Sequence, residues 1–247
     1  MNSFKLGLCS VTFRKKSMEE IVKIAAEAGV GYIEWGGDVH VRTLDDAKKA
    51  KAICDENYIK ISSYGSYFNA SDYDENEWEK MCKITKEMAG ESIRIWLGKK
   101  DSEKTSDEEY GILLSNMKKM CDKAREYGIL VCPECHDDTY NNNTDAFLRF
   151  SKNLDKNNFK TYFQSRYFRM EYDLDRIDRT YPYIENVHVS YRDLIREQKF
   201  REKDKNYLDK LLKTFLKKDF GGIIMVEFVS RDSRSQFMKD IEKLKAY

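Results

Sequence analysis

The sequence predicts an α/β protein of the (β/α)8 barrel class, and its 247 residues match the usual size of that class, about 250 residues. Three observations support this. Short apolar stretches alternate eight times with longer amphipathic ones. Connections after the helical stretches are short and often carry glycine, whereas connections after the strands are longer. Each of the three histidines follows, or sits within, a strand-like stretch.

The first half of the chain contains four strand–helix units with recognisable ends. Ser17 and Glu20 have the spacing of a capping box, in which each side chain bonds the other residue's backbone N–H. Gly29, Gly90 and Gly128 follow helical patterns at positions where glycine commonly ends a helix. We expect strands at residues 5–9, 32–35, 60–64 and 92–97, and helices at residues 18–28, 44–56, 75–88 and 106–127.

The second half repeats the alternation four times. No linker-like or low-complexity stretch interrupts it, so we expect one domain over residues 1–247. Residues 191–204 are dense in alternating charge, which is typical of a solvated loop; a lid or a contact in a homo-oligomer is the alternative. The expected strands lie at residues 129–133, 160–164, 187–189 and 222–228, and the expected helices at residues 144–154, 174–181, 206–218 and 233–247.

Composition excludes several classes of protein. The 44 basic and 43 acidic side chains nearly cancel, so the chain lacks the basic footprint of a nucleic-acid-binding protein. No apolar run approaches the roughly 20 residues of a membrane helix, and the first residues do not resemble a secretory signal. We therefore expect a cytoplasmic protein with six reduced cysteines. The pair Cys132 and Cys135 has redox or zinc spacing, but no second pair completes a zinc site.

Polar side chains follow four neighbouring strands of the second half. Glu134, Gln164, His188 and Glu227 stand at the ends of the fifth to eighth strands, which adjoin one another in a barrel. Carboxylate, imidazole and amide groups together suit Mn²⁺ or Mg²⁺, with Zn²⁺ or Co²⁺ as alternatives. His136 could add a ligand or contact the substrate. The sequence thus predicts a polar reactive site at the barrel mouth.

The chain resembles the xylose isomerase-like TIM barrels, in the sugar phosphate isomerase/epimerase branch that includes the D-tagatose and related ketose epimerases. The resemblance covers nearly the whole chain. It is carried by the stretches Gly31-Tyr32-Ile33-Glu34-Trp35-Gly36-Gly37-Asp38-Val39-His40-Val41, Ser63-Tyr64-Gly65-Ser66-Tyr67, Ile93-Arg94-Ile95-Trp96-Leu97-Gly98, Glu134-Cys135-His136, Phe163-Gln164, Val187-His188-Val189 and Val226-Glu227-Phe228.

The resemblance implies a divalent metal held by Glu, Asp, His and Glu from the last four strands. Glu134, His188 and Glu227 match three of these positions, whereas Gln164 stands where the family has Asp. The ligand charge therefore falls from −3 to −2. The resemblance also implies that Glu134 and Glu227 act as the acid and base on a small sugar substrate, because the two metal-binding glutamates of ketose epimerases face opposite sides of the substrate carbon.

Further side chains near strand ends are candidates for contact with the sugar. Aromatic faces can stack on its C–H surfaces, although such residues are often core residues. Glu34 is either a substrate contact or the partner of Arg94, and Arg94 and Arg166 could bind an anionic group. The candidate substrate contacts are Glu34, Trp35, His40, Tyr64, Tyr67, Trp96, His136 and Arg166.

Other functions remain open beside a sugar isomerase or epimerase. A dehydratase of inositol-type ketones uses similar acid–base groups on the same barrel. A non-catalytic sugar-binding barrel is supported by Gln164. An apurinic-site nuclease of the endonuclease IV kind needs a cluster of three zinc ions, which three histidines cannot supply.

Overall fold

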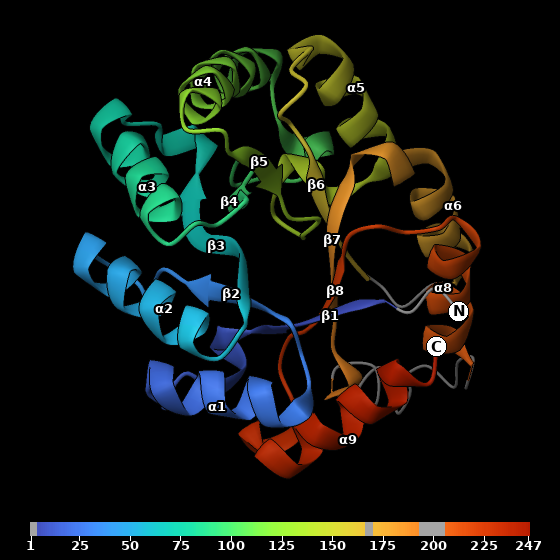
Figure 1. Cartoon of the computed structure of the whole chain (residues 1–247). Helices are drawn as coiled ribbons and strands as arrows, with labels where there is room; N and C mark the ends of the chain where they lie inside the picture. Colours follow the sequence, from blue (N-terminus) through green and yellow to red (C-terminus); the bar gives the residue numbers. More distant parts are fainter. Residues whose placement is uncertain (1–3, 166–169, 193–205) are drawn as a thin grey trace.

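The computed structural model describes residues 4–165, 170–192 and 206–247. Eight parallel strands lie in the order β5-β4-β3-β2-β1-β8-β7-β6. Two isolated parallel bridges, Val131 to Phe159 and Glu134 to Tyr162, join the ends of this series, so the sheet forms a nearly closed barrel. Helices surround the strands (Figure 1). The predicted (β/α)8 class is confirmed. Arg166 and most of the charged stretch 191–204 lie outside the described residues.

Most elements lie close to their predicted positions. The strands are β1 (Lys5–Cys9), β2 (Tyr32–Gly36), β3 (Lys60–Asn69), β4 (Ser92–Trp96), β5 (Leu130–Pro133), β6 (Thr161–Gln164), β7 (Ile184–Val189) and β8 (Ile223–Val226). The helices are α1 (Met18–Ala28), α2 (Leu44–Glu56), α3 (Glu75–Glu87), α4 (Asp107–Glu126), α5 (Thr144–Leu154), α6 (Met170–Thr180), α8 (Tyr207–Lys217) and α9 (Arg234–Lys245).

Two strands extend several residues beyond their predicted bounds, for identifiable reasons. β3 continues past the expected end at residue 64, through an irregular pairing with β4 that ends with Asn69 opposite Trp96. β7 begins at Ile184 instead of residue 187. Polar residues concealed its start, because Asn186 points into the barrel and donates a hydrogen bond to the Tyr162 hydroxyl at 2.9 Å.

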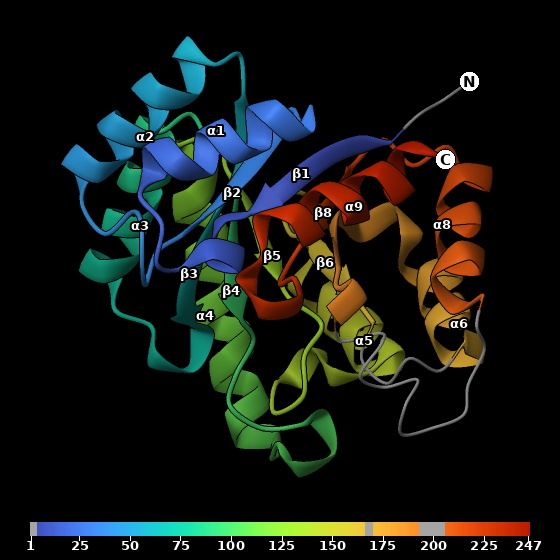
Figure 2. The same cartoon turned by 90° about the horizontal axis from the view of Figure 1, so that it is seen from below.

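Local sequence signals set the helix ends. Ser17 and Glu20 form the predicted capping box of α1, and Gly29 ends that helix in the left-handed conformation, with φ of 65°. Gly128 has φ of 73°, whereas after α3 the left-handed residue is Ala89, with φ of 58°, rather than Gly90. α9 packs against α1 and thereby brings the last helix beside the first (Figure 2).

The core has two parts. Most apolar side chains fill the space between the strands and the helices. A smaller cluster of Cys132, Tyr162, Ile223 and Met225 fills part of the barrel interior. Each of the six cysteines is buried and none forms a disulfide. Within the described ranges, no helix has the length and apolar character needed to cross a membrane.

Candidate functional site

The barrel interior carries a ring of side chains, one from each strand or from the residue just after it. In a parallel barrel all strand C-termini open on one face, so these side chains converge although they are far apart in sequence. We call them the mouth ring: Cys9, Glu34, Ser63, Arg94, Glu134, Gln164, His188 and Glu227.

Glu134, His188 and Glu227 meet as predicted. His188 Nδ1 lies 3.4 Å from Glu134 Oε1 and 3.6 Å from Glu227 Oε2. One ligand atom from each residue lies within 4.8 Å of the others. All three residues are at most 7% exposed, so their charges interact with little solvent screening.

Glu34 and Arg94 form the other side of the ring. Arg94 donates from Nε to Glu34 Oε1 at 3.1 Å and from Nη1 to Glu134 Oε2 at 2.5 Å. Glu34 is therefore the partner of Arg94, one of its two predicted roles. A permanent cation thus lies between two of the three buried glutamates, and it offsets the repulsion between them.

These contacts give the carboxylates different proton affinities. Burial raises the pKa of Glu134, but Arg94 and then His188 outweigh burial and bring that pKa below its ordinary value. For Glu227, burial dominates and raises the pKa to about 7, although His188 and Arg94 oppose it. Burial lowers the pKa of His188, but Glu227 and Glu34 reverse this and raise it to about 10. The two glutamates are therefore unequal as acid and base.

The mouth ring offers the ligand atoms that a divalent cation requires. Gln164 adjoins His188 in the β6–β7 register, and its Oε1 is buried without a hydrogen-bond partner among the described residues. Both ring nitrogens of His188 also lack a hydrogen bond within this part of the chain. Buried polar atoms of this kind are normally satisfied. Two carboxylates, an imidazole and an amide oxygen fit a divalent metal, which would bind His188 in its neutral form.

A second group of candidate ligands, Cys9, Glu34 and His188, suits a cation less well. Glu34 Oε1 already accepts from Cys9 Sγ at 3.2 Å and from Arg94 Nε at 3.1 Å. A metal ion at that oxygen would lie beside the guanidinium and be repelled by it. The metal-binding side of His188 is therefore the side that faces Glu134 and Glu227.

An aromatic rim lies next to the ring, on the side of β3, β4 and β5. The Trp96 and His136 rings meet edge to face with centroids 4.8 Å apart. The Tyr67 ring lies 6.2 Å from that of Trp96, and its centroid is 4.9 Å from Arg94 Cζ. Tyr67 has a left-handed backbone with φ of 57°, an unusual conformation for a bulky residue. His136 is exposed, so this rim is accessible to a ligand.

Three predicted substrate contacts lie away from the ring. Successive side chains of a strand point to opposite faces. Because Glu34 and Ser63 face the barrel interior, the next residues, Trp35 and Tyr64, face the helices. Trp35 is fully buried, and the Tyr64 hydroxyl donates to the Val41 carbonyl at 3.0 Å. His40 contacts Ser10 Oγ through Nδ1 at 3.0 Å and the Lys16 carbonyl through Nε2 at 3.2 Å. Trp35 and Tyr64 are therefore core residues, and His40 connects two loops, so the structure gives none of the three a position in the mouth ring.

Cys9 and Ser63 belong to the ring but were not singled out from the sequence. Ser63 donates to Glu34 Oε2 at 2.9 Å. A register shift between β2 and β3 pairs Glu34 with Ser63 instead of Ser62. Cys9 ends the first predicted strand, which is the signal that could have identified it. No comparable signal marks Ser63, because bulges depend on strand pairing.

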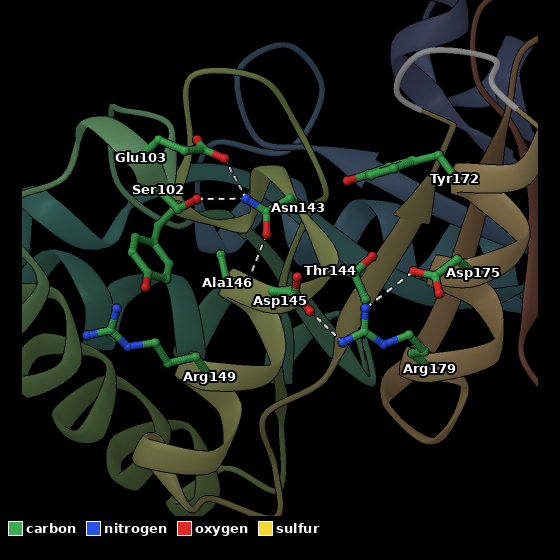
Figure 3. Close-up of a pocket in the computed structure, with 11 residues that line it drawn as sticks. Ser102, Glu103, Asn143, Thr144, Asp145, Ala146, Arg149, Tyr172, Asp175 and Arg179 are labelled. Carbon is green, nitrogen blue, oxygen red and sulfur yellow. Dashed lines mark hydrogen bonds and ion pairs between the residues drawn. The ribbon is translucent and has the colours of Figure 1, made fainter.

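A separate cleft of about 760 Å³ lies between α5 and α6 (Figure 3). Of the two arginines that line it, Arg179 is paired with Asp145 and Asp175. Asn143 donates to Ser102 Oγ and to Glu103, each at 2.8 Å. The lining contains no residue of the mouth ring, so the cleft is distinct from the candidate site.

Comparisons with known proteins identify the family of the chain and several solved structures with a similar fold. The profile of the xylose isomerase-like TIM barrel family matches residues 22–247. A comparison with curated proteins found no match. The probable 3-DHS dehydratase AsbF from Bacillus anthracis, involved in petrobactin synthesis, is a similar solved structure. It has 17% identity and a TM-score of 0.80, over 97% of this chain and 98% of that chain.

Two similar structures are epimerases. D-psicose 3-epimerase from Clostridium cellulolyticum, solved with D-tagatose, has 15% identity and a TM-score of 0.74, over 98% of this chain and 99% of that one. The 3-keto-D-glucoside 4-epimerase of E. coli has 13% identity and a TM-score of 0.78, over 99% of this chain and 100% of that one. At these identities, each similarity is one of fold.

Proposed function

Because the chain belongs to the xylose isomerase-like TIM barrel family, we propose that it is an isomerase or epimerase of a small sugar or sugar phosphate, working by proton transfer through an enediolate. One observation carries the proposal. Glu134 and Glu227 both reach His188 Nδ1, at 3.4 and 3.6 Å, from different strands. Two carboxylates around one small space can remove a proton from a substrate carbon and return one to it.

The surroundings of the two carboxylates indicate their roles. The direct contact with Arg94 Nη1 favours the ionised form of Glu134, which makes it the base that removes the proton beside the carbonyl. Glu227 has no such hydrogen bond to Arg94 among the described residues, and it is the acid that delivers a proton. Delivery to the opposite face of the same carbon gives epimerisation, and delivery to the neighbouring carbon gives isomerisation.

The mouth ring would also hold a cofactor, and the aromatic rim would contact the substrate. Bound by Glu134, Gln164, His188 and Glu227, a divalent cation (Mn²⁺, Mg²⁺, Zn²⁺ or Co²⁺) would polarise the substrate carbonyl and stabilise the negative charge on its oxygen. Trp96 and His136 form an accessible wall against which a sugar ring can pack. Trp35, Tyr64 and His40 are left out of the substrate site, because each is buried against the core or the loops.

Hydrogen exchange in D₂O tests the proposal. The purified protein is incubated with divalent metal and a panel of ketoses, aldoses and their phosphates, and each recovered sugar is analysed by mass spectrometry and NMR. Deuterium on the carbon beside the carbonyl, with an epimer or isomer as product, would support it. Loss of water from the substrate would identify a dehydratase instead. Tight binding with no exchange would identify a sugar-binding barrel.

A further inference from the structure

His188 is contacted on two opposite edges. Its Nδ1 faces Glu134 and Glu227, and its Nε2 lies 3.5 Å from Glu34 Oε1. The Tyr162 ring meets the imidazole edge to face, with centroids 5.1 Å apart and an interplanar angle of 87°. A half-turn of the imidazole about its Cβ–Cγ bond would preserve its plane and therefore this contact. The half-turn would exchange Nδ1 with Cδ2 and Nε2 with Cε1, so only the polar groups around the ring determine which of these atoms face the reactive space.

Glu34 is held rigidly enough to make that choice. Its Oε2 accepts from Ser63 at 2.9 Å, and its Oε1 accepts from Arg94 Nε at 3.1 Å and from Cys9 Sγ at 3.2 Å. Gly65 permits this packing, because a Cβ there would lie 2.9 Å from Arg94 Nη2 and 3.2 Å from Glu34 Oε1. Glu34 is fully buried and oriented by three different strands.

We propose that Glu34 is a positioning residue for His188, an inference that rests on the proposed function of the mouth ring. His188 Nε2 makes no hydrogen bond among the described residues, but a small rotation of the imidazole when Nδ1 binds a cation would let Glu34 Oε1, 3.5 Å away, accept the Nε2 proton. The lone pair of Nδ1 would then point between Glu134 and Glu227. A histidine that binds a metal commonly donates its other ring N–H to a carboxylate, which fixes the ring and raises its basicity. Glu34 contributes to the site without contacting the metal or the substrate.

The inference can be tested on the wild-type protein loaded with zinc, a diamagnetic probe. With ¹⁵N-labelled histidine, the three histidines give three sets of ring signals, and the variants His40→Gln and His136→Gln assign two of them. We expect His188 to carry its proton on Nε2 and to bind zinc through Nδ1. A proton on Nδ1, with zinc on Nε2, would overturn the proposal without any substitution of Glu34.

Two variants of similar side-chain length separate positioning from packing. Glu34→Gln keeps an acceptor oxygen, whereas Glu34→Met keeps only the bulk; both remove the charge beside Arg94. We expect zinc affinity, measured by calorimetry, to fall by about 10- to 100-fold in Glu34→Met and by much less in Glu34→Gln. Equal affinities in the two variants would show that Glu34 only fills space. Circular dichroism checks folding, and if Glu34→Met does not fold, retention of the Nε2 proton in Glu34→Gln decides.

Failure of this inference is distinguishable from failure of the proposed function. Zinc binding through Nδ1 without proton exchange on any sugar would support the role of Glu34 and discard the isomerase. Proton exchange together with zinc on Nε2 would keep the isomerase and discard the role of Glu34. A wild-type protein that does not bind zinc would overturn the role of Glu34.

Discussion

At the scale of single residues, the site depends on carboxylates that share a pocket but differ in their neighbours. Glu134 shares the guanidinium of Arg94 with Glu34, whereas Glu227 is buried beside His188. Like charges this close cannot all ionise at equal cost, so the arrangement of cations sets the protonation of each. The chemistry proposed for this ring therefore depends on individual oxygens.

Replacing either acid–base carboxylate should abolish most turnover. We expect Glu134→Gln and Glu227→Gln to slow substrate proton exchange by about 10²- to 10⁴-fold, because the amide cannot accept or deliver the proton. Thermal unfolding should show that the fold is retained. Glu185→Gln is the control, since Glu185 lies at the other end of β7 and should leave the exchange rate unchanged. Wild-type turnover in either site variant would disprove the mechanism.

Gln164 is a second test at this scale. Gln164→Asp should tighten divalent metal binding on the order of tenfold, because it restores a charged ligand. Calorimetry with Mn²⁺ measures the change. If the affinity does not change, Gln164 does not contact the metal.

At the scale of elements, loops and a β-bulge position the side chains of the mouth ring relative to one another. His40 connects the loops after β1 and β2 through Ser10 and Lys16. The bulge between β2 and β3 brings Ser63 to Glu34, and Gly65 gives Arg94 its room. Each of these contacts joins two neighbouring elements of the barrel, so substitutions at them should change the free energy of unfolding.

His40 should make folding sensitive to acid. Burial lowers the pKa of His40 in the folded state, whereas the unfolded chain has the ordinary value of about 6.5. Its contribution to stability is therefore present above pH 6.5 and is lost as the pH falls below that value, by at most about 1.4 kcal/mol per pH unit. Urea unfolding at pH 7.5 and 5.5 should show a smaller loss in His40→Gln than in wild type. His136→Gln, at an exposed histidine, should behave like wild type.

Two glycine substitutions should have opposite effects on stability. Gly65→Ala should destabilise the protein by about 1–3 kcal/mol, because the new methyl group overlaps Arg94. Gly111 lies in the interior of α4 with no atom within 4 Å of a Cβ, so Gly111→Ala should stabilise by about 0.5–1 kcal/mol. Chemical denaturation measures both. Equal effects of the two changes would contradict the packing described around Gly65.

At the scale of the whole molecule, the proposed metal ligands span the least paired seam of the barrel. β5 and β6 are joined only by isolated bridges among the described residues, whereas each of the other adjacent strand pairs shares a ladder of at least three partnered residues. Glu134 follows β5, and Gln164 ends β6. A metal ion held by both would connect the two edges of this seam.

Metal binding should therefore stabilise the fold. At a free metal concentration 100 times the Kd, the expected gain is about 2.7 kcal/mol, because a ligand that binds only the folded state favours folding. Unfolding with Mn²⁺ and with a chelator measures it. Hydrogen exchange should slow most in β5 and β6. An unchanged melting temperature, or protection spread evenly over the barrel, would argue against a metal across the seam.

Much of the fold and part of the site could be read from periodicity and capping, because both arise from contacts within a few residues. The alternation of elements, the capping box of α1 and the convergence of Glu134, His188 and Glu227 required no knowledge of packing beyond the barrel class. The start of β7 was missed, since polar residues that line a barrel interior break the apolar pattern.

The inward or outward direction of each side chain, and its partners, depended on long-range pairing. The shift between β2 and β3 sends Ser63 inward and Tyr64 outward, and the inward direction of Glu34 sends Trp35 into the helix layer. Arg94 reaches Glu34 and Glu134 across 60 and 40 residues. Contacts between residues this far apart form only when the barrel closes, so local sequence could name the chemical groups at the mouth but not their pairings.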